Sequence, residues 1–363
     1  MIETSMHSKS KSIVPEMVNL ILNGFGTKLF ITKTVGELIT GYKDPLLTLA
    51  QTFLPNLIKS NEFSIINGKN GTTWQNYTMM TGYDSIQNVA KIVSWDGMEK
   101  LDLYDAPGAN LINGTDGTFY PPFRTRDQVM YAYNSDMCRS YKLVYLKDAV
   151  VDDIDVYQFH LPQNIFYNAS SNPDNFGFCN ENDCLGNGVM NISKCYGGVS
   201  GFISQPHFLN ADKQFTDSFV GLNPNESRHD FILNFEPTSG VPIQGNIKFQ
   251  ISFYIFQNDK IDIVKNVKPA LYPLVWFDES LELFPDTRTQ LKQVALIAQL
   301  VIIIPIVLFA LGVFTVTVNL TIVLIRHLKR RPTDEEHEEI NEKTHLINSK
   351  LSEDSRYNKD LEN

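Results

Sequence analysis

The feature that most constrains this chain is an uncharged apolar run at residues 294–325, VALIAQLVIIIPIVLFALGVFTVTVNLTIVLI. A helix rises about 1.5 Å per residue and a bilayer core is roughly 30 Å thick, so about 20 apolar residues can cross it. A buried helix of a soluble protein would be shorter or amphipathic. We therefore predict a transmembrane helix at residues 291–325. Pro305 removes one backbone donor, so either the helix kinks there or its first turns lie in the membrane interface.

The charges that flank this run predict its orientation. Basic residues follow it and acidic residues precede it: Arg326, Lys329, Arg330 and Arg331 against Glu279, Glu282 and Asp286. Basic clusters of this kind are retained on the cytosolic side of a membrane. Residues 326–363 should therefore form a cytosolic tail, and residues 1–290 a luminal or extracellular domain.

Acceptor sites for N-linked glycans agree with this topology. The pattern Asn-x-Ser/Thr marks exposed positions in secreted domains, although any single match can arise by chance. Six matches precede the apolar run: Asn70, Asn76, Asn113, Asn168, Asn191 and Asn225. A further match, Asn319, lies inside the predicted membrane helix and should stay unmodified.

The chain has four cysteines, all on the side assigned to the lumen: Cys138, Cys179, Cys184 and Cys195. In an oxidising compartment an even set indicates a disulfide framework, so we expect two bridges. A zinc site is the alternative, but the set contains one closely spaced pair where zinc sites commonly have two. We therefore expect neither a metal site nor a cofactor. The spacing alone leaves the pairing of the cysteines open.

Residues 1–12, MIETSMHSKSKS, are polar and contain no apolar signal core. Nothing in them would deliver the following residues into a secretory compartment. We expect a longer natural form that begins with another hydrophobic segment. Insertion through the single span after synthesis is the alternative, but glycan acceptors and bridged cysteines would then serve no purpose.

Residues 15–22, PEMVNLIL, predict a short helix with Ser12 as a candidate cap, Pro15 in its first turn and Gly24-Phe25-Gly26 at its end. Its apolar residues surround more than one face. This pattern indicates either packing against other helices, which we expect, or an exposed patch that binds a partner. Residues 45–53, PLLTLAQTF, predict a second short helix.

From residue 61 onward the chain consists of short β-rich runs broken by Gly, Asn and Pro, which is typical of an antiparallel sheet or barrel. The clearest strand is residues 247–255, IKFQISFYI. Its odd-numbered residues are all apolar and its even-numbered residues are mostly polar. No internal repeat or long linker interrupts residues 1–290, so we expect one domain with a substantial core.

Residues 111–140, LINGTDGTFYPPFRTRDQVMYAYNSDMCRS, resemble the class B scavenger receptor family, and within it the lysosomal branch. The resemblance continues in conserved order along the chain, in KLF at 28–30, GYKD at 41–44, IVSWDG at 92–97, residues 177–195, PHF at 206–208, GLNPN at 221–225 and residues 249–255. Each motif alone is weak, but the ordered series is specific.

The resemblance implies an α+β membrane-anchored ectodomain. In this family an antiparallel β-barrel carries an apical helical bundle, here at about residues 13–55, and is held between two membrane spans. This chain would lack the first span and the first part of the barrel, which would leave unpaired strand edges. Family members bind or move lipids through an internal apolar tunnel, and the lysosomal branch also escorts an acid hydrolase.

The resemblance also implies specific residues. It pairs Cys138 with Cys195 and Cys179 with Cys184, and a set of four cysteines rather than six favours the lysosomal branch. It places the apical contact with a ligand or partner at residues 15–26, and the residues expected there are Met17, Leu20, Ile21 and Phe25. The lysosomal branch has a histidine where this chain has Lys33, so release of a cargo in acid is not implied.

The tail contains a candidate sorting signal. After the basic cluster, an acidic stretch is too charged to fold alone, and we expect it to be disordered. Within it Glu342, Leu346 and Ile347 fit an acidic dileucine signal, which a clathrin adaptor would read. This signal predicts a lysosomal or endosomal membrane, with the plasma membrane as the alternative.

An enzyme is not indicated. The segment at 197–201, GGVSG, does not have the spacing of a nucleophile elbow, because Phe202 occupies the last position. The luminal histidines His160, His207 and His229 are scattered singly, and we expect His207 to be a buried, hydrogen-bonded residue. A net charge of -10 disfavours nucleic acid as a partner.

Three hypotheses remain. The leading one is a lysosomal or endosomal receptor that binds sterol, fatty acid or phospholipid and conducts it through an apolar tunnel. The second is a trafficking receptor that escorts a soluble acid hydrolase. The third is a membrane-anchored enzyme.

Overall fold

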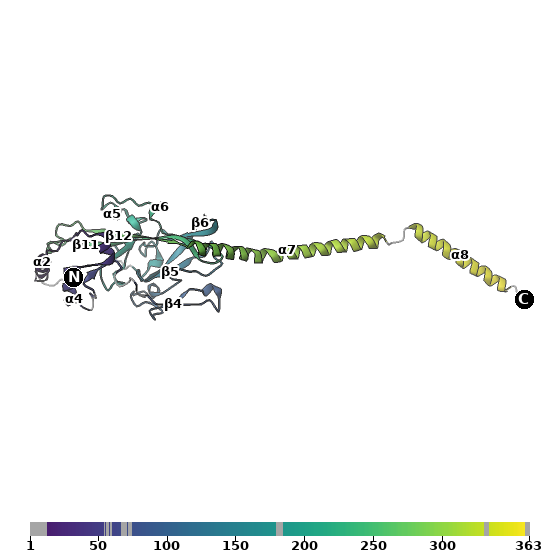
Figure 1. The fold of residues 1–363 in the computed structure, drawn as a ribbon, viewed down its shortest axis with the longest axis horizontal. Coiled ribbons are helices and arrows are strands. Elements are labelled where there is room, and N and C mark those ends of the chain that lie inside the picture. The colour runs from purple at the N-terminus through teal and green to yellow at the C-terminus, as the bar shows by residue number, and fades with distance from the viewer. Residues whose placement is uncertain are drawn as a thin grey trace. The chain divides into compact units, whose positions relative to one another are not determined.

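The computed structural model describes residues 13–53, 55, 58, 60–66, 71, 75–178, 184–329 and 334–359. The chain divides into two compact units, Met1–Gln290 and Leu291–Asn363. Figure 1 shows the first as a mixed unit of strands and short helices, and the second as helical.

Three helices lie near the start of the chain: α2 (Ile13–Gly24), α3 (Val35–Thr40) and α4 (Pro45–Phe53). Gly26 has φ 60° and follows α2. Its N–H donates to the Asn23 carbonyl, and the Thr27 N–H donates to the Leu22 carbonyl, which is the hydrogen-bond pattern of a Schellman motif. Both predicted helices are therefore confirmed. The candidate cap Ser12 lies outside the described residues.

A small two-stranded sheet connects these helices to the segment that follows. β1 (Tyr42–Lys43) pairs with β2 (Glu62–Phe63). Beyond β2, the Ile65 N–H donates to the Leu38 carbonyl of α3 at 2.9 Å. These bonds fix Ile65 and its neighbours next to α3, where they become part of the site described below.

The main sheet has eight strands in the order β5-β6-β7-β10-β11-β9-β8, with β12 on β11, and every pairing is antiparallel. Its strands are β5 (Met130–Asn134), β6 (Arg139–Val151), β7 (Ile154–His160), β8 (Val189–Asn191), β9 (Phe202–Ser204), β10 (Ile232–Phe235), β11 (Pro242–Ile255) and β12 (Ala270–Glu282). β3 (Tyr77–Met79) and β4 (Ile92–Trp95) form a separate pair. The predicted antiparallel sheet is confirmed.

No pairing closes the sheet into a barrel within the part of the chain that the structure describes. Its path ends at β5 and β8, and β12 pairs only with β11 among the described strands. Short helical turns lie between the strands: η1 (Ile86–Asn88), η2 (Pro107–Asn110), η3 (Pro173–Asn175), η4 (Pro206–Phe208), α5 (Lys213–Thr216) and α6 (Glu226–His229).

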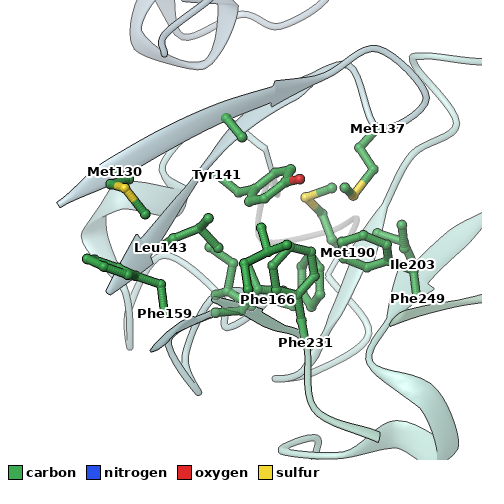
Figure 2. Packing of buried hydrophobic residues seen from close by; sticks show 14 of the residues in the cluster. Met130, Met137, Tyr141, Leu143, Phe159, Phe166, Met190, Ile203, Phe231 and Phe249 are labelled. Atoms are coloured by element: carbon green, nitrogen blue, oxygen red, sulfur yellow. The ribbon is translucent and has the colours of Figure 1, made fainter. Parts of the chain in front are cut away.

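The main core is packed against this sheet and is rich in aromatic side chains (Figure 2). Three aromatic rings contact one another, with centroids 5.7 to 6.2 Å apart: Tyr141 of β6, Phe231 just before β10, and Phe249 of β11. Edge-to-face and tilted contacts of this kind stabilise beyond the area that they bury. Phe249 therefore anchors β11 to the core.

The second unit contains the predicted membrane helix. α7 (Pro285–Lys329) is one uninterrupted helix with Pro305 inside it, and it is long and apolar enough to cross a membrane. It begins before the apolar run, so a polar helical segment precedes the predicted span. Pro305 does not end the helix.

The prediction of a disordered tail is wrong for the described residues. Asp334–Lys359 form the helix α8. Glu and Lys have high helix propensity, and the pair Glu339 and Lys343, four residues apart, are joined at 2.7 Å. High charge disfavours a packed core, but it does not prevent a solvated helix.

Candidate functional site

The site is built on the hairpin of β11 and β12. Directly opposite residues of an antiparallel pair share one face of the sheet. The register places Phe249 beside Phe277 and Ile251 beside Val275. It places Gln250 beside Trp276 on the opposite face. The alternation seen in the sequence therefore gives β11 an apolar face (Ile247, Phe249, Ile251 and Phe253) and a polar face (Lys248, Gln250 and Ser252).

The burial of these two faces is the reverse of what their polarity suggests. Gln250 and Ser252 on the polar face are each only 1% exposed. On the apolar face Ile247, Ile251 and Phe253 are only partly buried, and Phe249 alone is buried. Large apolar side chains that are left partly open mark a surface able to bind apolar material.

Two cavities lie over the apolar face. One has a volume of about 270 Å³ and is lined by Ile247, Phe249 and Ile251. The other, of about 300 Å³, is lined by Ile251 and Phe253. Both are completed by residues from distant segments, and they share four lining residues: Ile65, Ile192, Tyr196 and Ile251. We call the two adjoining cavities the apolar groove.

A few polar groups line the first of the two cavities. Asn134, Asp136 and Glu279 line the first cavity. The Tyr196 hydroxyl donates to the Asp136 carbonyl at 3.0 Å, which fixes the tyrosine ring in the lining. Mostly apolar walls with a small number of polar groups are typical of sites that bind amphipathic small molecules.

A disulfide joins two segments that line the groove. Cys138 and Cys195 are bridged, as predicted. Met137 precedes Cys138, Tyr196 follows Cys195, and both side chains line the first cavity. Cys184 is also disulfide-bonded. Cys179, its predicted partner, lies outside the described residues.

The four predicted apical contact residues differ in their exposure. Met17, Leu20 and Phe25 are exposed, Leu20 by 75%, whereas Ile21 is only partly so. The other side of α2 is packed: Val18 and Leu22 are buried against Ile261 and Val264. The helix therefore both packs and presents an apolar patch, where one of the two was expected.

The described glycan acceptors have different exposures. Asn76, Asn113 and Asn225 are exposed, Asn168 and Asn191 are partly buried, and Asn70 lies outside the described residues. At three acceptors the Asn Oδ1 accepts a hydrogen bond from the hydroxyl of the Ser two residues later, in Asn168, Asn191 and Asn225. In the tail, Glu342, Leu346 and Ile347 are exposed on α8.

The polar face of β11 brings together two histidines that the sequence analysis treated as isolated. The rings of His207 and His229 stack with centroids 4.3 Å apart, which corrects the expectation of single, scattered histidines. His207 is hydrogen-bonded, as expected, but only partly buried, whereas His229 is buried. Among the described residues, no cluster of three or more His, Cys, Asp or Glu could hold a metal ion.

Sequence reasoning missed most of the groove. The alternation at residues 247–255 identified the apolar strand, but no local signal linked it to Ile65, Ile192 or Tyr196. These residues reach the groove through β2, β8 and the Cys138–Cys195 bridge. A pairing between distant strands has no counterpart in the local hydrophobic pattern.

Comparison with known proteins adds a family match. Residues 1–323 match the CD36 family. The chain is 35% identical over 300 residues to Lysosome membrane protein 2 of Homo sapiens, a match that covers 82% of this chain and 62% of that protein. It is 34% identical over 276 residues to Scavenger receptor class B member 1 of Mus musculus, covering 76% of this chain and 53% of that protein. The chain thus spans less than two thirds of the length of these relatives.

Proposed function

The chain belongs to the CD36 family of class B scavenger receptors, and on that premise we propose that it is a membrane receptor that binds lipid in the apolar groove. The observation that carries the proposal is the half-open apolar face of β11 beneath two adjoining cavities. The ligand class is a sterol, a fatty acid or a phospholipid. No catalytic step is part of this function.

The chemistry of the groove supports an amphipathic ligand with an apolar chain. Apolar side chains line most of both cavities, and removing an acyl or sterol surface from water beside them is favourable in proportion to its area. The polar groups of Asn134, Asp136 and Glu279 in the first cavity offer hydrogen-bond partners for a headgroup. A ligand moving along the groove would pass Ile251, which lines both cavities.

The proposed location is a lysosomal or endosomal membrane, with the plasma membrane as the alternative. α7 would span the bilayer, residues 1–290 would be luminal and residues 326–363 cytosolic, because basic residues follow the span. The exposed side chains of Glu342, Leu346 and Ile347 would be available to a clathrin adaptor. The wider architecture that we propose is the family's β-barrel with α2, α3 and α4 in its apical bundle.

The test is lipid binding with a blocked groove. Ile251→Trp places a large side chain at the residue shared by both cavities, and photo-crosslinking of the purified chain with a diazirine fatty acid and a diazirine sterol is measured. We expect crosslinking of at least one probe to fall several-fold. Val150→Trp is the matched control, because Val150 is exposed and lines neither cavity. Undiminished crosslinking in a folded Ile251→Trp chain would refute lipid binding in the groove.

The exposed patch on α2 favours a second candidate function, escort of a soluble acid hydrolase. Met17, Leu20 and Phe25 form an apolar surface that an amphipathic partner helix could cover. Leu20→Glu should abolish co-purification of such a hydrolase and leave lipid crosslinking unchanged. Val18 and Leu22 are unsuitable for this test because they are buried in the fold.

A further inference from the structure

The stacked histidines on the polar face of β11 join two segments that are distant in the sequence. His207 lies in η4 and His229 ends α6, and their ring planes differ by only 11°. Trp276 of β12 contacts both rings edge-on, with centroids 6.2 and 5.8 Å away. The pair is therefore enclosed on one side by an aromatic ring of the hairpin.

Each histidine accepts a backbone hydrogen bond from the same short segment. The Asn223 N–H donates to His207 Nδ1 at 3.0 Å, and the Asn225 N–H donates to His229 Nδ1 at 3.1 Å. Pro224, between them, has no N–H, so the histidines bind every backbone donor of residues 223–225. Because Nδ1 accepts, each ring must carry its proton on Nε2 and be neutral.

The surroundings of the pair are cationic. Lys248 of β11 donates to the Arg228 carbonyl at 2.6 Å and lies 3.7 Å from Asp278 of β12. Arg228, Lys248 and Asp278 line the same cavity as the two histidines, which has a volume of about 950 Å³. Burial, together with the neighbouring His207, Lys248 and Arg228, lowers the pKa of His229.

Two further titratable groups lie next to α6. His160 Nδ1 of β7 is 3.3 Å from Asp230 Oδ2, and Gln205 donates to the other oxygen of Asp230 at 2.9 Å. His160 thus lies next to α6 but outside the histidine stack, so it provides a matched control for the variants below.

We propose that His207 and His229 form an acid-operated latch that holds residues 223–225 against the stacked rings at neutral pH and releases them in acid. This segment carries the glycan acceptor Asn225 and borders the cavity that Lys248 and Trp276 line. Its release would expose a polar surface of the receptor in an acidic compartment and conceal it elsewhere.

Proton linkage predicts that a fall in pH releases the latched segment. Protonation puts a hydrogen on Nδ1, where it faces a backbone N–H, so the hydrogen bond is lost. Two protonated rings 4.3 Å apart would also repel each other and the nearby cations. A histidine that is neutral when latched and free to titrate when released stabilises the latched form fully above about pH 6.5, and progressively less as pH falls below it.

Hydrogen exchange of the full chain in detergent tests the latch. Exchange at Asn223 and Asn225 is compared at about pH 7.5 and pH 5, after correction for intrinsic rates. We expect protection at pH 5 to fall, by at most about thirtyfold for each histidine whose reference pKa is about 6.5. Protection of β9, at residues 202–204, should not change. Equal protection of Asn223 and Asn225 at both pH values would refute the latch.

Variants separate titration from packing. Asn can place an oxygen near the position of Nδ1 without titrating, so His207→Asn with His229→Asn should remove the pH dependence. His160→Asn is the matched control and should retain it. A double variant that loses protection in acid as the unmodified chain does would show that these two rings are not the sensor. Should the double variant not fold, His229→Asn alone should show a smaller response to pH, and an unchanged response would also refute the proposal.

Discussion

The two faces of β11 differ in a way that its sequence does not indicate. The polar face is almost fully buried because its groups find partners: Gln250 accepts from the His207 N–H and donates to Ser204 and Ser252. The apolar face is only partly covered and borders two cavities. Polar groups can be buried where their hydrogen bonds are satisfied, whereas apolar groups left open are available to a ligand. The difference separates a structural face from the face that we propose binds lipid.

Breaking the disulfide should have the largest effect on this arrangement, because it joins two segments that line the groove. Cys138→Ala with Cys195→Ala removes a crosslink between residues separated by 57 positions. The chain-entropy argument gives a loss of about 4 kcal/mol. The denaturation midpoint of the solubilised chain measures it, with Val199→Ala on the same loop as the control. An unchanged midpoint would show that the two segments are held by packing alone.

Removing the anchor of the apolar face should have the next largest effect. Phe249→Ala deletes a buried ring that contacts Tyr141 and Phe231, and we expect a loss of about 3 kcal/mol in the free energy of unfolding. Phe253→Ala is the control on the same face of the same strand, and it should cost less because Phe253 is only partly buried. Equal losses measured by denaturant unfolding would contradict the contrast between core and groove.

Removing a hydrogen bond on the polar face of β11 should have an intermediate effect on stability. Gln250→Leu leaves the His207 N–H without its acceptor, at a residue held in the left-handed region with φ 55°. We expect a loss of about 2 kcal/mol in unfolding free energy. Gln244→Leu on the same strand should cost less, since Gln244 is less buried and its hydrogen bond with Asn234 is 3.4 Å long. If the Gln250→Leu variant had an unfolding free energy equal to or above that of the unmodified chain, packing alone would account for the burial of this face.

Enlarging the groove should have the smallest effect. Ile251→Ala removes part of a side chain that already borders two cavities, so we expect a loss of about 1 kcal/mol. Ile243→Ala on the same strand should cost about twice as much or more, because Ile243 is fully buried. Thermal unfolding of both variants measures the difference. The reverse order would mean that the groove is a packed core.

Local patterns predicted the regular elements well. Gly26 ends α2 because a residue without a Cβ tolerates the left-handed conformation that the helix end requires. The pattern could not tell which apolar side of α2 is buried. Val18 and Leu22 pack against Ile261 and Val264, which lie between β11 and β12 and are far from α2 in the sequence. The exposed patch formed by Met17 and Leu20 was therefore one of two open alternatives.

For the tail, the sequence analysis predicted the wrong local conformation. Its charge was taken to exclude folding, but α8 needs no core, because each residue bonds within its own helix. Charge patterns predict whether a segment can bury itself, and they say less about its local conformation. Leu346 and Ile347 are exposed on this helix, whereas a disordered segment was predicted.

The sequence by itself determined the long apolar helix, the antiparallel character of the sheet and the alternation of β11, since these depend on composition and on the period of neighbouring side chains. Tertiary structure alone decided which face of β11 is buried, which distant residues complete the groove, and that His207 lies on His229. The physical reason is that burial and stacking depend on partners brought together across long loops, and local periodicity carries no information about those partners.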